Sequence, residues 1–283
     1  MRSAGNQGRV VRLARTVSGQ RLRHSGSAMV EWLIAVPVLL MLGLGFFQAS
    51  ELLVARLALR HALSEAARAG SVSNASAQAI LQGLADGLSP WLYGADGPGE
   101  IAAARIRSRA QVALGRASGW VELRQHSPTP ASFGDWGEPA NDGTGRSING
   151  RQIAFDALPT EYRLRQPNSG VAGFQGPAPI GRESGQTLAD ANLLVLELVY
   201  GVPVRIPFAG SMLLKTLRAI HGCGSFVGGT AGLQGALGQT SNCRYYNALD
   251  FNGQPGPRIP VRVQVVMRMQ SAARLQGSLL EAR

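Results

Sequence analysis

The 283-residue chain has few charged residues and little cysteine. Charged residues make up only 16% of it, and lysine occurs once, at Lys215. Two cysteines are too few for a disulfide-dense scaffold or a four-cysteine zinc module. Hydrophobic residues still reach 45%, so the chain can form a core and wholesale disorder is excluded. The 36 glycines and 15 prolines predict many turns and long loops.

Residues with catalytic or metal-binding chemistry do not cluster along the sequence. Asp135 and Glu138 are neighbouring carboxylates, but they fall in a stretch rich in Gly and Pro, which predicts an exposed turn. We therefore expect no enzymatic activity, no catalytic residue, no metal site and no cofactor. The four histidines stand in four different contexts, at His24, His61, His126 and His221.

The formal net charge of +11 first suggests a nucleic-acid partner, so the position of the charge matters. Residues 1–26 contain six arginines and no acidic residue, and without these arginines the net charge falls to +5. The sequence shows no RNP-type aromatic motif, zinc-finger spacing or helix-turn-helix signature. We therefore expect no nucleic-acid partner and interpret residues 1–26 as a basic leader. Its arginines are Arg2, Arg9, Arg12, Arg15, Arg21 and Arg23.

A long uncharged run follows this leader. Residues 32–50 contain no charge, and Glu31 alone separates them from the uncharged residues 27–30. A helix of about 20 residues crosses a bilayer, so the length fits one span. The arginines in front place the leader in the cytoplasm and the rest of the chain in the periplasm. The sequence thus predicts a single-pass inner-membrane protein whose residues 27–50 lie in the lipid bilayer.

The apolar run continues beyond residue 50 without a turn signal. Residues 51–69 are strong helix formers, and Leu53 with Leu57 and then Leu59 with Leu63 fall at helical spacing. A cleavable secretory signal is the alternative, but its apolar core is usually about 7–15 residues long. We therefore expect one helix over residues 28–69, with a transmembrane half and then an amphipathic half.

The start of this helix carries a processing motif. A Gly followed by four residues and a Glu, just before an apolar run, is the prepilin processing pattern, and Gly26 and Glu31 have this spacing. A prepilin peptidase would cut after Gly26 and leave Ser27 as the new N-terminus. The freed α-amine is cationic at neutral pH, and Glu31 can neutralise it within its own helix or on a neighbouring one. Pro37 lies inside the span and should kink the helix or open it locally.

The segment Arg23-His-Ser-Gly-Ser-Ala-Met-Val-Glu-Trp-Leu-Ile-Ala-Val-Pro-Val-Leu-Leu resembles the N-terminus of TadE-like proteins, the minor pseudopilins of tight-adherence (Flp, type IVc) pili. Gly26, Glu31 and Pro37 match the family pattern. Ordinary type IV and type II secretion pilins usually place Phe after the cut, so Ser27 fits the tight-adherence branch better. A region of over 200 residues after the span favours a minor subunit, because major Flp pilins are very short.

The resemblance implies a subunit that a prepilin peptidase cleaves and that contributes to assembly or initiation of a pilus for surface attachment. It would contact other pilins and pseudopilins through the N-terminal helix, and also the inner-membrane assembly platform. The final location could include the extracellular pilus. Two alternatives stay open. One is a single-span, membrane-anchored periplasmic binding protein, and the other is a pseudopilin of a secretion system.

The region after the span has the sequence pattern of an α+β fold with a small antiparallel sheet and long loops rich in Gly and Pro. We expect a helical region over residues 51–116 and a sheet-containing domain over residues 117–283, including a long irregular loop at 126–187. The expected helices are 75–88, 100–116 and 208–221, and the expected strands are 120–125, 192–200 and 259–270.

The two cysteines, Cys223 and Cys243, lie in this exported region, where disulfides persist. A bridge between them would close a Gly-rich loop over residues 223–243. His221 with both cysteines could instead supply three zinc ligands, but no fourth ligand is evident. We therefore expect the disulfide.

Overall fold

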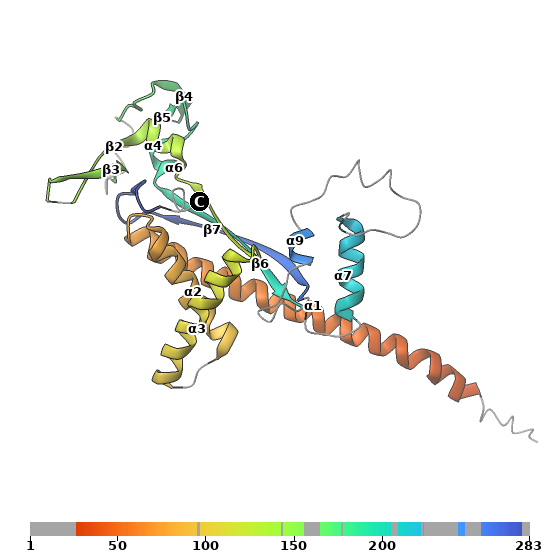
Figure 1. Ribbon diagram of the computed structural model, residues 1–283. Coiled ribbons are helices and arrows are strands. Elements are labelled where there is room, and N and C mark those ends of the chain that lie inside the picture. The colour runs from red at the N-terminus through yellow and green to blue at the C-terminus, as the bar shows by residue number, and fades with distance from the viewer. Residues whose placement is uncertain are drawn as a thin grey trace, which may run out of the picture. The chain divides into compact units, whose positions relative to one another are not determined.

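A computed structural model gives the fold of the chain (Figure 1). It describes residues 27–94, 97–142, 144–155, 165–176, 178–204, 209–221, 223, 243–246 and 256–278. The chain divides into two compact units, Met1–Gly43 and Leu44–Arg283. The described part of the first unit is the beginning of helix α1, and the second unit contains the rest of α1 and the other elements. The fold is α+β, as the sequence predicts.

Helix α1 is a single helix of 46 residues, Ser27–Val72. Pro37 lies inside it without ending it. The helix ends before a tight turn in which Asn74 and Ala75 both have positive φ, at 58° and 59°. The side chain of Asn74 donates to the carbonyl of Ala272 at 2.7 Å, which holds this left-handed turn against the C-terminal segment. The predicted single helix is therefore confirmed.

Helices α2 (Ala77–Tyr93) and α3 (Pro98–Ala117) follow as an antiparallel pair. Both were expected, but α2 extends past Pro90, where a helix normally ends. Proline cannot donate to the carbonyl four residues earlier, which belongs to Asp86. The hydroxyl of Ser89 donates to that carbonyl at 2.8 Å instead, and the helix continues for one more turn.

Helices α1 and α2 approach each other through small residues. A Cβ atom built on Gly87 would lie only 2.7 Å from the Cα atom of Ala62, and one built on Gly83 would lie 3.0 Å from the Cα atom of Ala66. Glycine at these two positions therefore lets the backbones come close, and larger residues would push the helices apart.

Gly87→Ala is expected to destabilise the folded unit by about 1–3 kcal/mol, because the added methyl group overlaps Ala62. The matched control is Gly99→Ala on α3, where a Cβ atom would meet nothing within 4 Å. Alanine is the better helix former, so this control should be neutral or slightly stabilising. Thermal unfolding of the two full-length variants in detergent measures the difference. Equal unfolding temperatures for both would contradict the tight contact.

The central sheet has three antiparallel strands in the order β1-β6-β7. Their bounds are Val121–Ser127, Leu193–Pro203 and Arg258–Arg268. Leu194, Leu196 and Leu198 of β6 are fully buried and join the core that α1 and α2 cover. Successive side chains on a strand alternate between the two faces of the sheet, so residues 262, 264, 266 and 268 of β7 lie on the opposite face and are exposed. The three predicted strands are present.

Residues 126–187 contain more secondary structure than their composition predicts. Their described part forms two small hairpins and a short helix, with a one-turn helix directly after it. These elements are too short for apolar periodicity to mark them, and side-chain caps and polar contacts add to the burial of Phe133, Trp136 and Ile153 in the main core. Thr129 and Thr187 form capping boxes at the two helix starts. The elements are α4 (Pro130–Trp136), β2 (Gly137–Asn141), β3 (Ser147–Ile153), β4 (Val171–Gln175), β5 (Ala178–Gly181) and α6 (Leu188–Ala191).

The expectation that Asp135 lies in an exposed turn is wrong. Asp135 is fully buried at the end of α4. Its carboxylate accepts hydrogen bonds from the hydroxyl of Ser169, from the backbone N–H of Glu183 at 3.3 Å, and from the backbone N–H and the hydroxyl of Ser184 at 2.7 and 2.6 Å. Glu138 is half-buried instead and pairs with Arg165 at 2.7 Å. Asp135 therefore connects α4 to the segments on both sides of the β4–β5 hairpin.

A second, smaller core cluster joins α7 (Ala209–Ile220), α9 (Cys243–Tyr246) and the start of β7. Leu214, Tyr246 and Ile259 are buried in it. A disulfide joins Cys223 to Cys243, with the two Cα atoms 5.2 Å apart. Both sulfurs are in this bond, so they are not thiolate ligands for zinc. The loop at 224–242 lies outside the described residues.

Candidate functional site

Helix α1 carries the residues predicted for processing and assembly. Gly26 lies outside the described residues, and Ser27 is the first residue of the helix. Glu31 follows four residues later, one helical turn away, and Pro37 lies further along; both side chains are exposed. Among the described residues, Glu31 has no ion-pair partner. Its role and those of Gly26, Ser27 and Pro37 stay predictions.

The first half of α1 exposes apolar side chains around its whole circumference. Residues 31–34 are all exposed, and four consecutive positions at 100° each cover every side of a helix. Trp32 is 66% exposed and Phe46 is 77% exposed. A helix that is apolar on all sides is normally surrounded by lipid or by protein. Other exposed apolar side chains here belong to Met29, Leu33, Ile34, Val38, Leu39, Leu40, Leu42 and Phe47.

In the part of the chain that the structure describes, α1 is the one helix long and apolar enough to cross a membrane, and the segment Glu31–Val72 meets this criterion. Its second half has a different environment. Ala55, Leu59, Ala62 and Leu63 lie on one helix face and are at most 1% exposed, since they pack into the main core. One continuous helix thus joins an exposed apolar segment to a buried, packed one.

A largely apolar cavity of about 330 Å³ lies beside the middle of α1. Among its described lining residues Glu51 is the one that carries a charge, and none of them is a His, Cys or Lys that could serve as a base or nucleophile. Within the described ranges, no group of three or more His, Cys, Asp or Glu side chains could hold a metal ion. The cavity lining comprises Phe47, Ser50, Glu51, Val54, Trp91, Val202 and Pro203.

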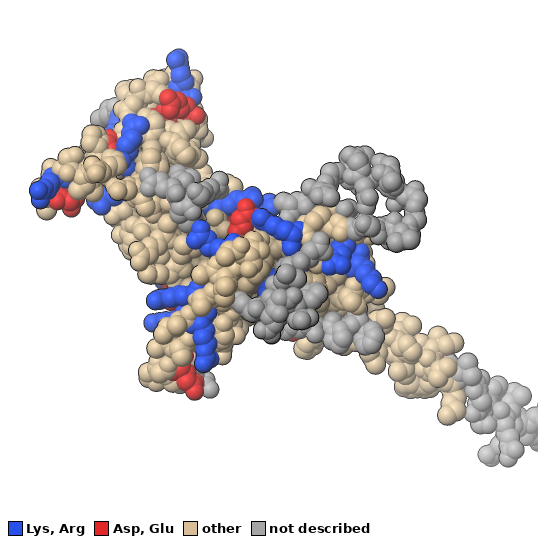
Figure 2. Space-filling view, in the orientation of Figure 1, with Lys and Arg blue, Asp and Glu red and all other residues tan. Residues whose placement is uncertain are grey.

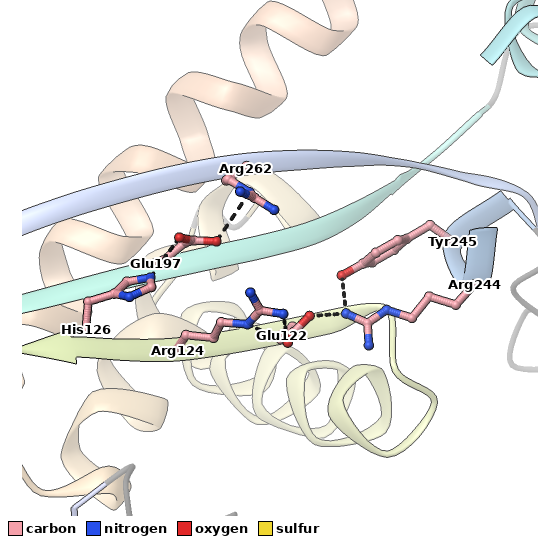
Figure 3. Close-up of polar contacts among 7 residues, drawn as sticks. All are labelled: Glu122, Arg124, His126, Glu197, Arg244, Tyr245 and Arg262. Carbon is pink, nitrogen blue, oxygen red and sulfur yellow. Dashed lines mark hydrogen bonds and ion pairs between the residues drawn. The ribbon is translucent and has the colours of Figure 1, made fainter. Parts of the chain in front are cut away.

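Two groups of polar contacts lie on the face of the sheet that points away from the main core (Figure 3). In the first group, the Glu197 carboxylate is 2.8 Å from Nε2 of His126 and 3.3 Å from Nε of Arg262. Glu122 accepts a hydrogen bond from Nε of Arg124 at 2.6 Å and another from Arg244. These side chains come from β1, β6, β7 and α9.

The second group, around Glu122, anchors the disulfide to the sheet. Burial alone raises the pKa of Glu122, but hydrogen bonds from Arg124 and Arg244 outweigh it and hold the pKa below its ordinary value. Glu122 therefore stays ionised at neutral pH. Arg244 directly follows Cys243 in α9 and also donates to the hydroxyl of Tyr245 at 3.0 Å. The ion pair between Arg244 and Glu122 holds α9 on β1, so we assign these residues a structural role.

Comparison with known protein families identifies the exposed helix. Residues 26–68 match the family model of TadE-like proteins. The resemblance inferred from Gly26, Glu31 and Pro37 is thereby confirmed over these residues. The match covers well under half of the chain, and residues 69–283 lie outside it. No curated protein and no solved structure matches the chain.

The TadE-like segment includes both halves of α1, from the exposed apolar part to the part packed in the core. The sequence identified this helix because an apolar run and a Gly–Glu spacing are local signals. It missed the polar contacts on the sheet, where Glu122 and Arg244 are far apart in the chain. Alternation of polar and apolar residues over 121–127 predicts which side chains share a face, but it does not predict their partners.

Proposed function

We propose that the chain is a minor pilin-like subunit of a tight-adherence pilus, anchored in the inner membrane by α1 and cleaved by a prepilin peptidase after Gly26. The observation that supports this most is a TadE-like helix with exposed apolar side chains on every side and a single carboxylate, Glu31, near its start. Such a surface requires lipid before assembly and neighbouring helices after it. The rest of the chain would then fold in the periplasm.

The role of Glu31 follows from its distance along the helix. Cleavage after Gly26 creates an α-amine at Ser27, one turn from Glu31. Ionisable groups within a membrane are rare and pair with one another, so the carboxylate would neutralise this amine on its own helix or on the next subunit. Pairing between subunits would set the axial position of each helix in the filament. The protein would act as a structural component without enzymatic activity.

Mass spectrometry and N-terminal sequencing test the processing step. After co-expression with a prepilin peptidase, the membrane-extracted protein is expected to begin at Ser27 and to lack residues 1–26. Gly26→Leu should block the cut, because a side chain at this position occludes the backbone that the peptidase must reach. Gly19→Leu, a change of the same size in the leader, should leave the cut intact. An N-terminus other than Ser27 would contradict the proposal.

The same experiment separates the two alternatives. A membrane-anchored binding protein would keep residues 1–26 whether or not the peptidase is present. A secretion pseudopilin would be cut, so it must be distinguished by its assembly partners. Co-purification with short Flp-like pilins supports the pilus, whereas co-purification with secretion pseudopilins supports the secretion system.

A further inference from the structure

Helix α7 packs against α1 close to the end of the uncharged run. A Cβ atom built on Gly210, at the start of α7, would lie 3.5 Å from Oε1 of Gln48. Leu52 packs against the same cluster that buries Leu214. Gln48 and Leu52 lie on either side of Ser50, where the uncharged run ends. A transmembrane span of about 20 residues that starts near Ser27 would also end near Ser50. Helix α7 therefore lies at the level where the bilayer would meet water.

The two sides of α7 have different surroundings. Leu214 is 6% exposed and faces the cluster with Tyr246 of α9, which lies beside α7 in Figure 1. On the other side, Met212 and Ile220 are 62% and 64% exposed. Lys215 is also exposed, on the same side of the helix as Met212. The fold therefore uses one side of α7 and leaves Met212, Lys215 and Ile220 exposed on the other.

The sequence around α7 carries only positive charge. Residues 198–249 contain four basic residues and no acidic residue, although the chain as a whole has 17. Lys215 is the only lysine of the protein and forms no ion pair with a described residue. Figure 2 shows basic side chains over α7, whereas the nearest acidic ones on this face lie over the sheet. No acidic residue of this stretch would repel an anionic surface.

We propose that the free side of α7 lies on the membrane surface and binds anionic phospholipid headgroups through Lys215. The aliphatic stem of a lysine lies along apolar surface while its ammonium group reaches a phosphate, so Met212 and Ile220 can contact the outer acyl region beside it. The bilayer already surrounds α1 at this level, and no further partner is required. This inference rests on the proposed membrane insertion of α1.

Photo-crosslinking of the full chain in lipid nanodiscs tests the proposal. A photoreactive amino acid replaces Met212, and the nanodiscs contain phosphatidylcholine alone or mixed with phosphatidylglycerol. Lipid adducts at position 212 are expected, with more in the anionic nanodiscs. Ile106 on α3 is 67% exposed and serves as the matched control position, where lipid adducts should be absent. Equal labelling in both lipids, or labelling of a second protein chain instead of lipid, would overturn the proposal.

Charge reversal tests the role of the lysine. Lys215→Glu is expected to lower labelling at position 212 in anionic nanodiscs by about fivefold or more, since one charge near such a surface changes the binding equilibrium by about that factor. Arg107→Glu, at an exposed position on α3, makes the same change in net charge and should have no effect. Equal losses in both variants would show a general charge effect and contradict a specific site.

A probe at Leu39 separates this proposal from the proposed function. Leu39 lies in the uncharged run and is 61% exposed, so it should be labelled by lipid in every nanodisc. Absence of lipid adducts at Leu39 would overturn the membrane anchor and the α7 contact together. Adducts at Leu39 without adducts at position 212 would overturn the α7 contact alone.

Discussion

Glu31→Ala is expected to abolish pilus assembly while cleavage after Gly26 continues. Without the carboxylate, the α-amine at Ser27 would enter the apolar environment between helices with no partner. Removal of one partner from a buried ion pair destabilises by about 3–5 kcal/mol, which reduces the assembled fraction at each such contact by at least a hundredfold. The measurement is a count of surface pili, combined with N-terminal sequencing of the membrane-bound subunit.

The matched control for this variant is Glu65→Ala. Glu65 lies on the same helix, and it pairs with Arg68 at 3.2 Å on the surface of the folded unit. Exposed pairs of this kind contribute little, so pili should form normally. Normal piliation by the Glu31→Ala strain would show that the carboxylate has no role in assembly. Loss of cleavage in that strain would instead place Glu31 in peptidase recognition.

The second large effect concerns stability. Asp135→Asn is expected to destabilise the folded unit by about 3 kcal/mol, because an uncharged amide cannot accept hydrogen bonds from all the donors that surround this carboxylate. The donors belong to Ser169, Glu183 and Ser184, and the side chain of Asp135 is fully buried. Thermal unfolding of the solubilised full chain measures the loss. Faster amide hydrogen exchange at residues 183–184 locates it.

The effect of Asp135 should depend on pH. Burial raises the pKa of Asp135, but the hydrogen bonds from Ser169 and Ser184 outweigh it and hold the pKa below its ordinary value. A carboxylate with a lowered pKa in the folded state contributes stability above its ordinary pKa of about 4 and loses that contribution as the pH falls through the lowered value. The difference between the wild type and Asp135→Asn should therefore be full at neutral pH and shrink in acid.

Asp142→Asn is the control for these measurements. The Asp142 carboxylate also accepts local hydrogen bonds, from the backbone and the hydroxyl of Thr144 at 2.9 and 2.6 Å, but its side chain is exposed. Water can replace these bonds, so the unfolding temperature should hardly change. If the two variants behave alike at neutral pH, the burial of Asp135 is not the source of its effect.

Most of the positive net charge lies in two separate parts of the chain. Six of the eleven charges belong to residues 1–26, and their place before an apolar run is a topology signal. A second group lies in the acid-free residues 198–249, around α7. The first group would remain in the cytoplasm, and Lys215 of the second would face the outer surface of the same membrane. Neither group of positive charges requires a nucleic-acid partner to explain it.

The sequence alone was sufficient where the signal is local. The helix α1 and the strands β6 and β7 follow from residue spacing within one segment. Prediction of the region over 126–187 was less successful, because its hairpins depend on polar contacts between distant segments. Asp135 shows this well: its donors at Ser169 and Ser184 are 34 and 49 residues away. The composition around Asp135 predicted an exposed turn, whereas long-range hydrogen bonds hold its carboxylate in a buried position.

What the sequence by itself determined is a membrane-type helix and an α+β domain after it, because hydrophobic length and periodicity are properties of contiguous residues. Only the tertiary structure decided which charges meet: Glu122 with Arg244 on the sheet, and Lys215 with no protein partner among the described residues. Ion pairs depend on distances that arise when the chain has folded. The sequence does not show that Lys215, the single lysine, lies near the end of the uncharged run; the contact of α7 with α1 does.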